Sequence, residues 1–222
     1  MNSFFQNINV NVSQNLYLKD PLSSELGIHI LDKGLVLMNS LGYENFTIKK
    51  LAKAIKTTES SVYRYFENKR KLTLYYLSWY CAMIEFLIVT HISENDSLDE
   101  IINQIIVILI NQHELKHSHP DLSYTDLQQL ISAELEHIVN SNDSAFLHLK
   151  NEVTDSLILR ISQLLAPHCT TSIKIKELII MLFNDLHRQK RCYKLLQEAA
   201  TFKTNHELAA YYKDILTKLI SV

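Results

Sequence analysis

The chain has 222 residues, of which 47% are apolar and 21% charged, with a formal net charge of −2 at pH 7. It contains only three glycines and three prolines, whereas average usage would give about 15 and 11 at this length. Turns of β-hairpins and β-sandwiches use Gly and Pro, and phosphate-binding loops need several glycines close together. The composition therefore excludes an all-β fold and P-loop or Rossmann fingerprints, and it predicts an almost entirely helical protein.

The charge is unevenly distributed along the chain. Residues 21–80 hold nine Lys/Arg and five Asp/Glu, which gives +4, whereas residues 81–222 hold twelve and eighteen, which gives −6. A basic block attached to an acidic body indicates a small nucleic-acid-binding module on a second domain.

Features of secreted and membrane proteins are absent from the sequence. The three cysteines are widely separated, at Cys81, Cys169 and Cys192. This spacing forms neither a disulfide framework nor a CxxC metal motif. No basic residue precedes Lys19, and the longest apolar runs, 105–110 and 178–183, have six residues, far fewer than the roughly 18 that span a bilayer. We expect a cytoplasmic protein without a membrane partner.

The first predicted element is an arm at residues 1–20, which is rich in Asn and Gln. Its apolar residues alternate with asparagine at Ile8, Val10 and Val12. This period of two is typical of an arm or an isolated strand and not of a helix. Asp20-Pro21 is a helix-start signal, and Ser23 and Ser24 are rival capping residues.

Four helices are predicted next. The first ends at Gly42, because a residue with positive φ costs least as glycine. Thr47 caps the second helix, Thr57 or Thr58 caps the third, and the fourth begins at Lys69. Asn95 and Asp96 end the fourth helix. Further helices are predicted at 97–117, 123–140, 144–166, 172–198 and 205–221.

Residues 47–66 form two short helices with inward apolar stripes, joined by about three residues, which is the geometry of a helix-turn-helix. The outward residues of the second helix are Thr58, Ser60, Ser61 and Arg64, flanked by Tyr63 and Tyr65. Hydroxyl side chains bond bases or phosphates, and arginine reads guanine in bidentate fashion. Lys69 begins the next helix, where backbone N–H groups favour a phosphate. A helical corner inside an ordinary α-bundle has the same spacing, so the pattern alone leaves both interpretations open.

A family resemblance favours the first interpretation. The motif residues are Ile30-Leu31, Gly42-Tyr43, Thr47-Ile48, Leu51-Ala52, Val62-Tyr63-Arg64-Tyr65-Phe66-Glu67-Asn68-Lys69 and Leu72. This ordered stretch resembles the DNA-binding domain of the tetracycline-repressor (TetR) family. The resemblance implies an all-α homodimer whose remaining helices bind a small ligand and dimerise. It implies DNA contacts, mostly to phosphate, by Thr47, Ser61, Tyr63, Tyr65 and Lys69. It places Thr58, Ser60 and Arg64 against bases or the groove wall.

Two positions depart from the family pattern. Lys56 stands in the turn where the family commonly has glycine, and a positive φ there would cost lysine roughly 1 kcal/mol relative to glycine. Glu59 stands near the start of the third helix, where Lys or Arg is frequent. Glu59 either acts as a favourable acid at the helix N-terminus or accepts a hydrogen bond from cytosine N4.

The later helices carry two further hypotheses. Trp79, Tyr80, Met83 and Phe86 lie at helical spacing on the fourth helix and either line a ligand cavity or belong to the core. The stretch 178–183 is apolar all round, so its helix is buried on two sides. We expect the helices near 172–198 and 205–221 to form a homodimer interface.

A competing motif lies at 113–117. His113-Glu114-Leu115-Lys116-His117 has the H-E-x-x-H pattern of zinc peptidases. Glu136 follows at a spacing that some zinc peptidases use for a third ligand. However, Pro120 ends the helix just past His117, and no edge strand for a peptide substrate is predicted.

The sequence therefore predicts an all-α protein with an N-terminal three-helix helix-turn-helix domain and a helical ligand-binding and dimerisation domain. The predicted divisions are an arm at 1–20, a DNA-binding domain at 21–68 and a regulatory domain at 69–222. The predicted function is that of a ligand-responsive transcriptional regulator, a repressor, which binds a double-stranded DNA operator as a homodimer and responds to a small-molecule effector. It is not expected to be an enzyme or to need a cofactor or metal. The alternatives are a zinc metallopeptidase built on 113–117 and a metal-sensing regulator that uses the same histidines.

Overall fold

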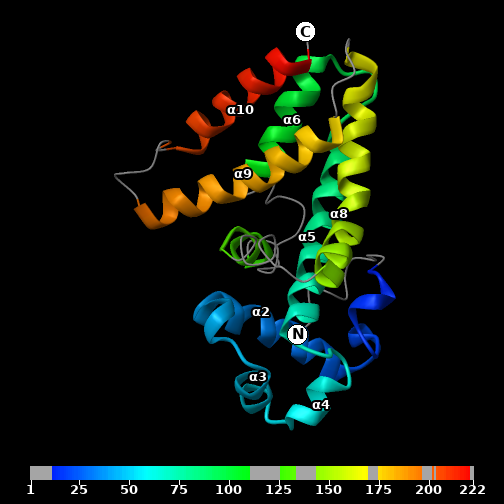
Figure 1. The fold of residues 1–222 in the computed structure, drawn as a ribbon, viewed down its shortest axis with the longest axis vertical. Coiled ribbons are helices and arrows are strands. Elements are labelled where there is room, and N and C mark those ends of the chain that lie inside the picture. Colours follow the sequence, from blue (N-terminus) through cyan, green and yellow to red (C-terminus); the bar gives the residue numbers. More distant parts are fainter. Residues whose placement is uncertain are drawn as a thin grey trace. The chain divides into compact units, whose positions relative to one another are not determined.

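The structure, a computed structural model, describes residues 12–110, 126–133, 144–169, 175–196, 202 and 204–220. Within these residues every regular element is a helix and none is a strand (Figure 1). The predicted all-α class is confirmed. Apolar periodicity with almost no chain-breaking residues is sufficient to specify this class.

Contacts divide the chain into two compact units. Unit 1 comprises Met1–Ala82 and Asp121–Thr154, and unit 2 comprises Met83–Pro120 and Asp155–Val222. Two long helices, α5 (Lys69–His91) and α8 (Ser144–Leu165), each begin in unit 1 and continue into unit 2. The predicted division at residue 68 concerns function and stays a prediction.

Unit 1 is built around short helices that pack on the first half of α5. Its other labelled elements are η1 (Gln14–Leu16), η2 (Pro21–Ser23), α2 (Glu25–Asn45), α3 (Ile48–Ala54) and α4 (Glu59–Tyr63). Residues 126–133 are also helical. The core includes Ile30 and Leu31 of α2, Leu51 of α3 and Val62 of α4, which are almost completely buried. Residues 72–80 of α5 are all buried beside them.

Both predicted start signals are used, one after the other. The side chain of Asp20 accepts a hydrogen bond from Leu22 N at 2.8 Å and starts η2, with Pro21 at its first position. The Ser24 hydroxyl then accepts from Gly27 N at 3.3 Å and caps α2. Each cap satisfies a backbone donor that the following helix leaves without a partner.

The predicted helix end at Gly42 is a kink and not an end. Gly42 has φ 74° and ψ 160°, which are non-helical, yet α2 continues to Asn45, and Phe46 N donates to the Gly42 carbonyl at 3.0 Å. The positive φ that the sequence predicted for Gly42 is confirmed. The chain resumes helical geometry for one more turn, which Phe46 caps, and Phe46 is completely buried.

Helix α5 ends at His91, earlier than the predicted Asn95–Asp96. A closed turn follows, in which Ser93 N donates to the Asp96 carboxylate at 2.9 Å and Asp96 N to the Ser93 carbonyl at 3.1 Å. By length and composition alone α5 is apolar enough to cross a membrane, but 78% of its most apolar window is buried inside the structure. That burial is what a core helix of a globular protein shows.

Unit 2 contains α6 (Leu98–Ile110), η4 (Ala166–His168), α9 (Ile175–Leu196) and α10 (Asn205–Ile220), together with the second parts of α5 and α8. Helix α6 has a polar side in its first half, at Asp99, Glu100, Asn103 and Gln104, and seven of its apolar residues are buried. It lies beside α10, and Lys213 Nζ of α10 contacts Asp99 Oδ2 of α6 at 2.9 Å. The described ends of α8, α9 and α10 fall within three residues of the predicted ones.

Candidate nucleic-acid interface

Helices α3 and α4 form the predicted helix-turn-helix, and each begins at a threonine cap. Thr47 Oγ1 accepts from Lys50 N at 3.2 Å, and Thr58 Oγ1 accepts from Ser61 N at 3.2 Å. The inward residues Ile48, Leu51 and Val62 are at most 5% exposed. The two helices are therefore held against the unit 1 core with their opposite faces toward solvent.

The turn between α3 and α4 contains the strained residue that the sequence indicated. Lys56 has φ 55°, and no other non-glycine residue within the described ranges has a positive φ. Its N–H donates to the Lys53 carbonyl at 3.2 Å, and Thr57 N donates to the Ala52 carbonyl at 2.9 Å. These bonds close the C-terminus of α3 as a glycine would, so lysine carries the left-handed strain.

Most of the predicted DNA-contacting residues lie on the outward face. Thr47, Thr58, Ser60 and Arg64 are exposed, Tyr63 is 43% exposed, and Ser61 is half-buried. The Ser61 hydroxyl is 2.9 Å from the Thr58 hydroxyl. Since Ser61 also donates its N–H to Thr58, its first role is to fix the cap of α4.

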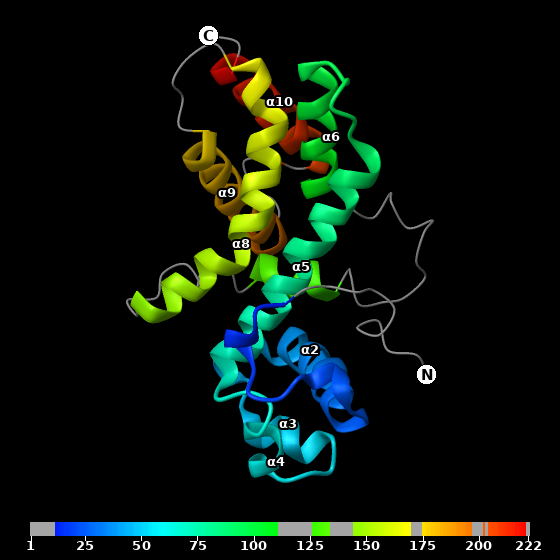
Figure 2. The same cartoon turned by 90° about the vertical axis from the view of Figure 1, so that its right-hand side faces the viewer.

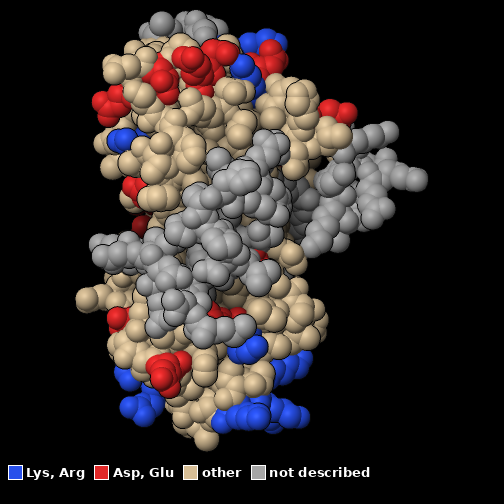
Figure 3. Space-filling model, turned by 180° about the vertical axis from the view of Figure 1, so that it is seen from behind, with Lys and Arg blue, Asp and Glu red and all other residues tan. Residues whose placement is uncertain are grey.

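This face is strongly basic, and we call the exposed side chains of residues 47–64 the basic face. Its cations are Lys49, Lys50, Lys53, Lys56 and Arg64, all of them exposed, and Glu59 is its single acid. None of these cations pairs with a carboxylate in the described part of the chain. Figure 3 shows Lys and Arg side chains gathered over the part of unit 1 that contains α3 and α4. Unpaired cations on one face attract a polyanion and exchange their counterions for its phosphates.

Tyr65 does not lie on the basic face. It is only 4% exposed, and its hydroxyl lies 2.8 Å from the Ser24 hydroxyl and accepts from Lys19 Nζ at 3.3 Å. Burial alone would raise the pKa of Tyr65, but these hydrogen bonds and the nearby positive charges outweigh it and lower the pKa. The sequence pattern could not separate this buried tyrosine from exposed Tyr63, because both flank the same helix end.

Lys69 is also held by neighbours within unit 1. Its Nζ donates to the Tyr43 carbonyl at 2.8 Å and lies 4.1 Å from the centre of the Tyr43 ring. The cation therefore ties the start of α5 to the end of α2. A carbonyl acceptor leaves the ammonium its full charge, so Lys69 still contributes to the potential near the basic face.

The four predicted ligand residues of α5 are placed in two groups. Trp79 and Tyr80 are completely buried in unit 1. Met83 is 7% exposed and Phe86 is 49% exposed, and both belong to unit 2. The half-exposed ring of Phe86 lies at the surface and not in the core of unit 2.

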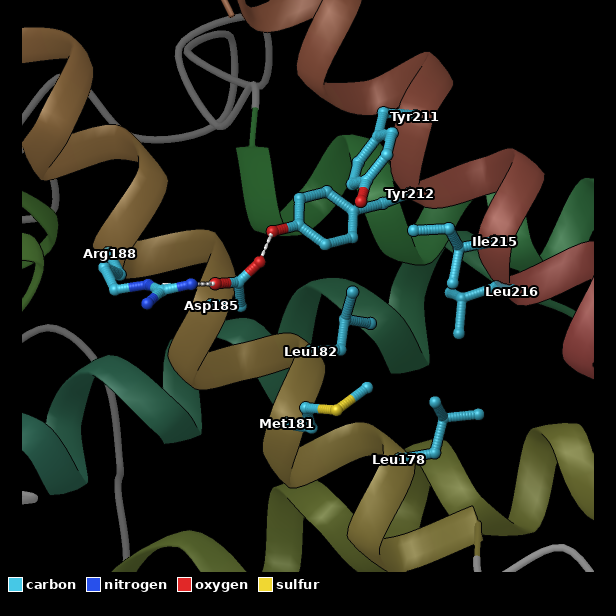
Figure 4. A pocket seen from close by; sticks show the side chains of 9 residues that line it. All are labelled: Leu178, Met181, Leu182, Asp185, Arg188, Tyr211, Tyr212, Ile215 and Leu216. Atoms are coloured by element: carbon cyan, nitrogen blue, oxygen red, sulfur yellow. Dashed lines mark hydrogen bonds and ion pairs between the residues drawn. The ribbon is translucent and has the colours of Figure 1, made fainter. Parts of the chain in front are cut away.

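A groove that the sequence did not predict lies between α9 and α10 in unit 2 (Figure 4). It has a volume of about 310 Å³ and is lined by Leu178, Met181, Leu182, Asp185, Arg188, Tyr211, Tyr212, Ile215 and Leu216. Figure 4 shows the Tyr212 hydroxyl and the Arg188 guanidinium directed at the Asp185 carboxylate. The spacing of Asp185 and Arg188 indicates an i,i+3 pair, but nothing in the sequence links them to Tyr212.

The histidine motif at 113–117 and Glu136 lie outside the described residues. Within the described ranges, no group of three or more His, Cys, Asp or Glu side chains could hold a metal ion.

An all-α chain whose N-terminal helix-turn-helix presents an exposed basic face has the architecture of a DNA-binding transcriptional regulator. The family model described as "Bacterial regulatory proteins, tetR family" matches residues 30–76, which include α3, α4 and the adjoining parts of α2 and α5. Residues 30–76 therefore form a DNA-binding domain of the kind that this family model describes. The resemblance that the motif indicated is confirmed.

Two solved structures share the fold over most of their length. The fatty acid degradation regulator FadR from Bacillus halodurans superposes with a TM-score of 0.60 at 16% identity, covering 85% of this chain and 92% of that one. A regulatory protein in the tetR family from Rhodococcus RHA1 gives a TM-score of 0.59 at 12% identity, covering 89% and 97%. At these identities the likeness is one of fold. No curated protein matches the sequence, and none of these comparisons points to a peptidase.

Proposed function

We propose that the protein is a ligand-responsive repressor that binds a near-palindromic DNA operator as a homodimer in the cytoplasm. The observation that supports this proposal most directly is the basic face. Five exposed cations and one acid lie within a helix-turn-helix whose two helices are both capped and packed. A surface of this composition on a rigid pair of helices is suited to a DNA groove and its phosphates.

The residues of the basic face have different roles in this proposal. Thr58, Ser60 and Arg64 face the base edges, because Thr58 and Ser60 lie at the start of α4 and Arg64 lies at its end. Thr47 and Tyr63 reach phosphates from the flanks, together with the lysines of α3. Tyr65 and Lys69, whose polar groups already have partners in unit 1, hold α4 and α5 in position.

The groove of α9 and α10 is the proposed dimer interface. Ile180 and Met181 of α9 and Tyr211 and Leu219 of α10 are large apolar residues that are 39–58% exposed. Exposed apolar side chains on two helices, around a groove that also holds the ion pair of Arg188 and Asp185, have the anatomy of a protein interface. A second copy that presents the same two helices would close a four-helix interface and set the distance between two basic faces.

The proposed response to an effector is a population shift. Two recognition helices one turn of DNA apart, about 34–36 Å, read an operator. A ligand that prefers another spacing must supply roughly 5.5 kcal/mol of differential affinity to release the DNA almost completely. Helices α5 and α8 are the candidates to carry the shift, because each belongs to both units.

Selection from a random double-stranded DNA library tests the proposal. We expect enrichment of a near-palindrome whose half-sites are one helical turn apart. Arg64→Ala should then weaken binding to the selected DNA by about 1–3 kcal/mol and binding to scrambled DNA only slightly. Lys176→Ala, which removes an exposed cation of unit 2, is the matched control and should bind both DNAs like the unmutated protein. Failure to enrich any DNA would refute the proposal.

A further inference from the structure

Residues 13–19, which we call the strap, cross several helices of unit 1 before η2 begins. Leu16 at the centre of the strap is completely buried, and the Tyr17 ring packs edge-on against Tyr75 of α5 at 6.2 Å between ring centres. The strap lies beside the first turns of α5 in two perpendicular views (Figures 1 and 2). It is therefore a fixed part of unit 1.

One end of the strap is bonded to the end of the recognition helix. Leu18 N donates to the Tyr65 carbonyl at 2.8 Å, and Lys19 Nζ donates to the Tyr65 hydroxyl at 3.3 Å and lies 5.1 Å from the ring centre. Tyr65 comes two residues after α4 ends at Tyr63. The strap thus holds both the main chain and the side chain of the residue that joins α4 to α5.

The other end of the strap is bonded to α8. Ser13 Oγ donates to Glu152 Oε1 at 2.6 Å, and Asn15 Nδ2 reaches the same oxygen at 3.5 Å. Lys71 Nζ of α5 donates to the Asn15 carbonyl, which fixes the middle of the strap. Glu152 lies two residues before Thr154, where α8 passes from unit 1 into unit 2.

We propose that the strap couples α8 to the recognition helix, with Glu152 and Tyr65 as positioning residues for DNA binding. A hydroxyl bonded to a carboxylate at 2.6 Å is lost when the distance grows by about 1 Å. A small movement of α8 along its axis therefore breaks the bond to Ser13, and the strap that holds the Tyr65 carbonyl loses one of its attachments. The proposal rests on the proposed DNA-binding function and adds a route by which α8 controls it.

Hydrogen exchange of the free protein tests the coupling without DNA. Ser13→Ala and Glu152→Ala should each make amides of residues 57–66 exchange about tenfold faster, the loss expected for one hydrogen bond to a charged group. Glu85→Ala is the matched control, because Glu85 accepts from the α8 hydroxyl of Ser156 at 2.9 Å within unit 2. It should leave the exchange of 57–66 unchanged. Circular dichroism checks that all three variants remain folded.

Binding to the selected DNA at several salt concentrations tests the consequence. Both strap variants should bind about tenfold more weakly with an unchanged salt slope, because they remove no phosphate contact. A direct phosphate contact would instead lower the slope by about 1. Unchanged exchange at 57–66 in both strap variants would overturn the inference, and so would unchanged DNA affinity. If the unmutated protein binds no DNA, the proposed function fails, and the exchange measurement still decides whether the strap connects α8 to α4.

Discussion

Replacing Lys56 by glycine should stabilise the protein, although most substitutions of a surface lysine by glycine destabilise. Lys56 has φ 55°, a conformation that costs an L-residue roughly 1–2 kcal/mol. Glycine adopts it without strain but loses about 0.5–1 kcal/mol of backbone freedom on folding. The difference predicts that Lys56→Gly raises the free energy of unfolding by about 0.5–1 kcal/mol.

Lys53 provides a matched control three residues away. It is an exposed lysine in the last turn of α3 with ordinary helical geometry. Lys53→Gly removes the same charge from the same face but should lower the free energy of unfolding by about 0.7–1 kcal/mol, because glycine is a poor helix former and the helix C-terminus loses a cation. The two substitutions should therefore change the free energy of unfolding in opposite directions, and the two variants should differ by about 1–2 kcal/mol.

Urea unfolding followed by circular dichroism measures both variants. On a chain of this length a change of 1 kcal/mol moves the thermal midpoint by about 2–4 °C, so a thermal scan gives an independent value. If Lys56→Gly is as destabilising as Lys53→Gly, the strain at residue 56 is not released by glycine, and the reasoning from φ is refuted.

Three further predictions concern packing, pH and assembly. Gly34→Ala would place a Cβ 2.5 Å from the buried Tyr76 hydroxyl, and the overpacking should lower the free energy of unfolding by about 1–3 kcal/mol in urea; an unchanged midpoint would show that Tyr76 moves freely. Burial raises the pKa values of Tyr75, Tyr76 and Tyr212, so the folded state keeps protons that the unfolded state loses above pH 10. The free energy of unfolding should then be independent of these groups below pH 10 and fall above it by about 1.4 kcal/mol per pH unit for each group. Unfolding curves that coincide at pH 9, 10 and 11 would contradict this. Met181 lines the groove and is 58% exposed, so Met181→Glu should convert a dimer into a monomer. Light scattering measures the mass, and an unchanged mass would exclude this face as the interface.

Local signals in the sequence predicted local structure well. Thr47, Thr58 and Asp20 act as caps because a short polar side chain bonds its own backbone two or three residues away. The strain at Lys56 was predictable because the turn geometry requires a positive φ whichever residue stands there. These interactions involve neighbours in the chain, so a single sequence contains them.

Contacts between distant segments were not predictable in the same way. Ser13 and Glu152 are separated by 139 positions and Asp185 and Tyr212 by 27, and no periodicity specifies which polar groups meet after folding. The burial of Tyr65 was missed for the same reason, since its partners Lys19 and Ser24 come from the segment before α2. Each of these pairs depends on how the helices pack against one another, and a single sequence does not specify that packing.

The passage of α5 through both units limits how the protein can be dissected. A recombinant fragment of residues 21–68 would lack residues 72–80, all of which are buried in unit 1. It would also lack Leu127, Leu130 and Ile131, which are buried in the same unit but come from far along the chain. A fragment without these segments would expose the apolar surface that holds α2 and α3, so the DNA-binding head is not a transplantable module. Chimaeras made by exchanging heads between regulators would need to carry the second segment of unit 1 along with the first.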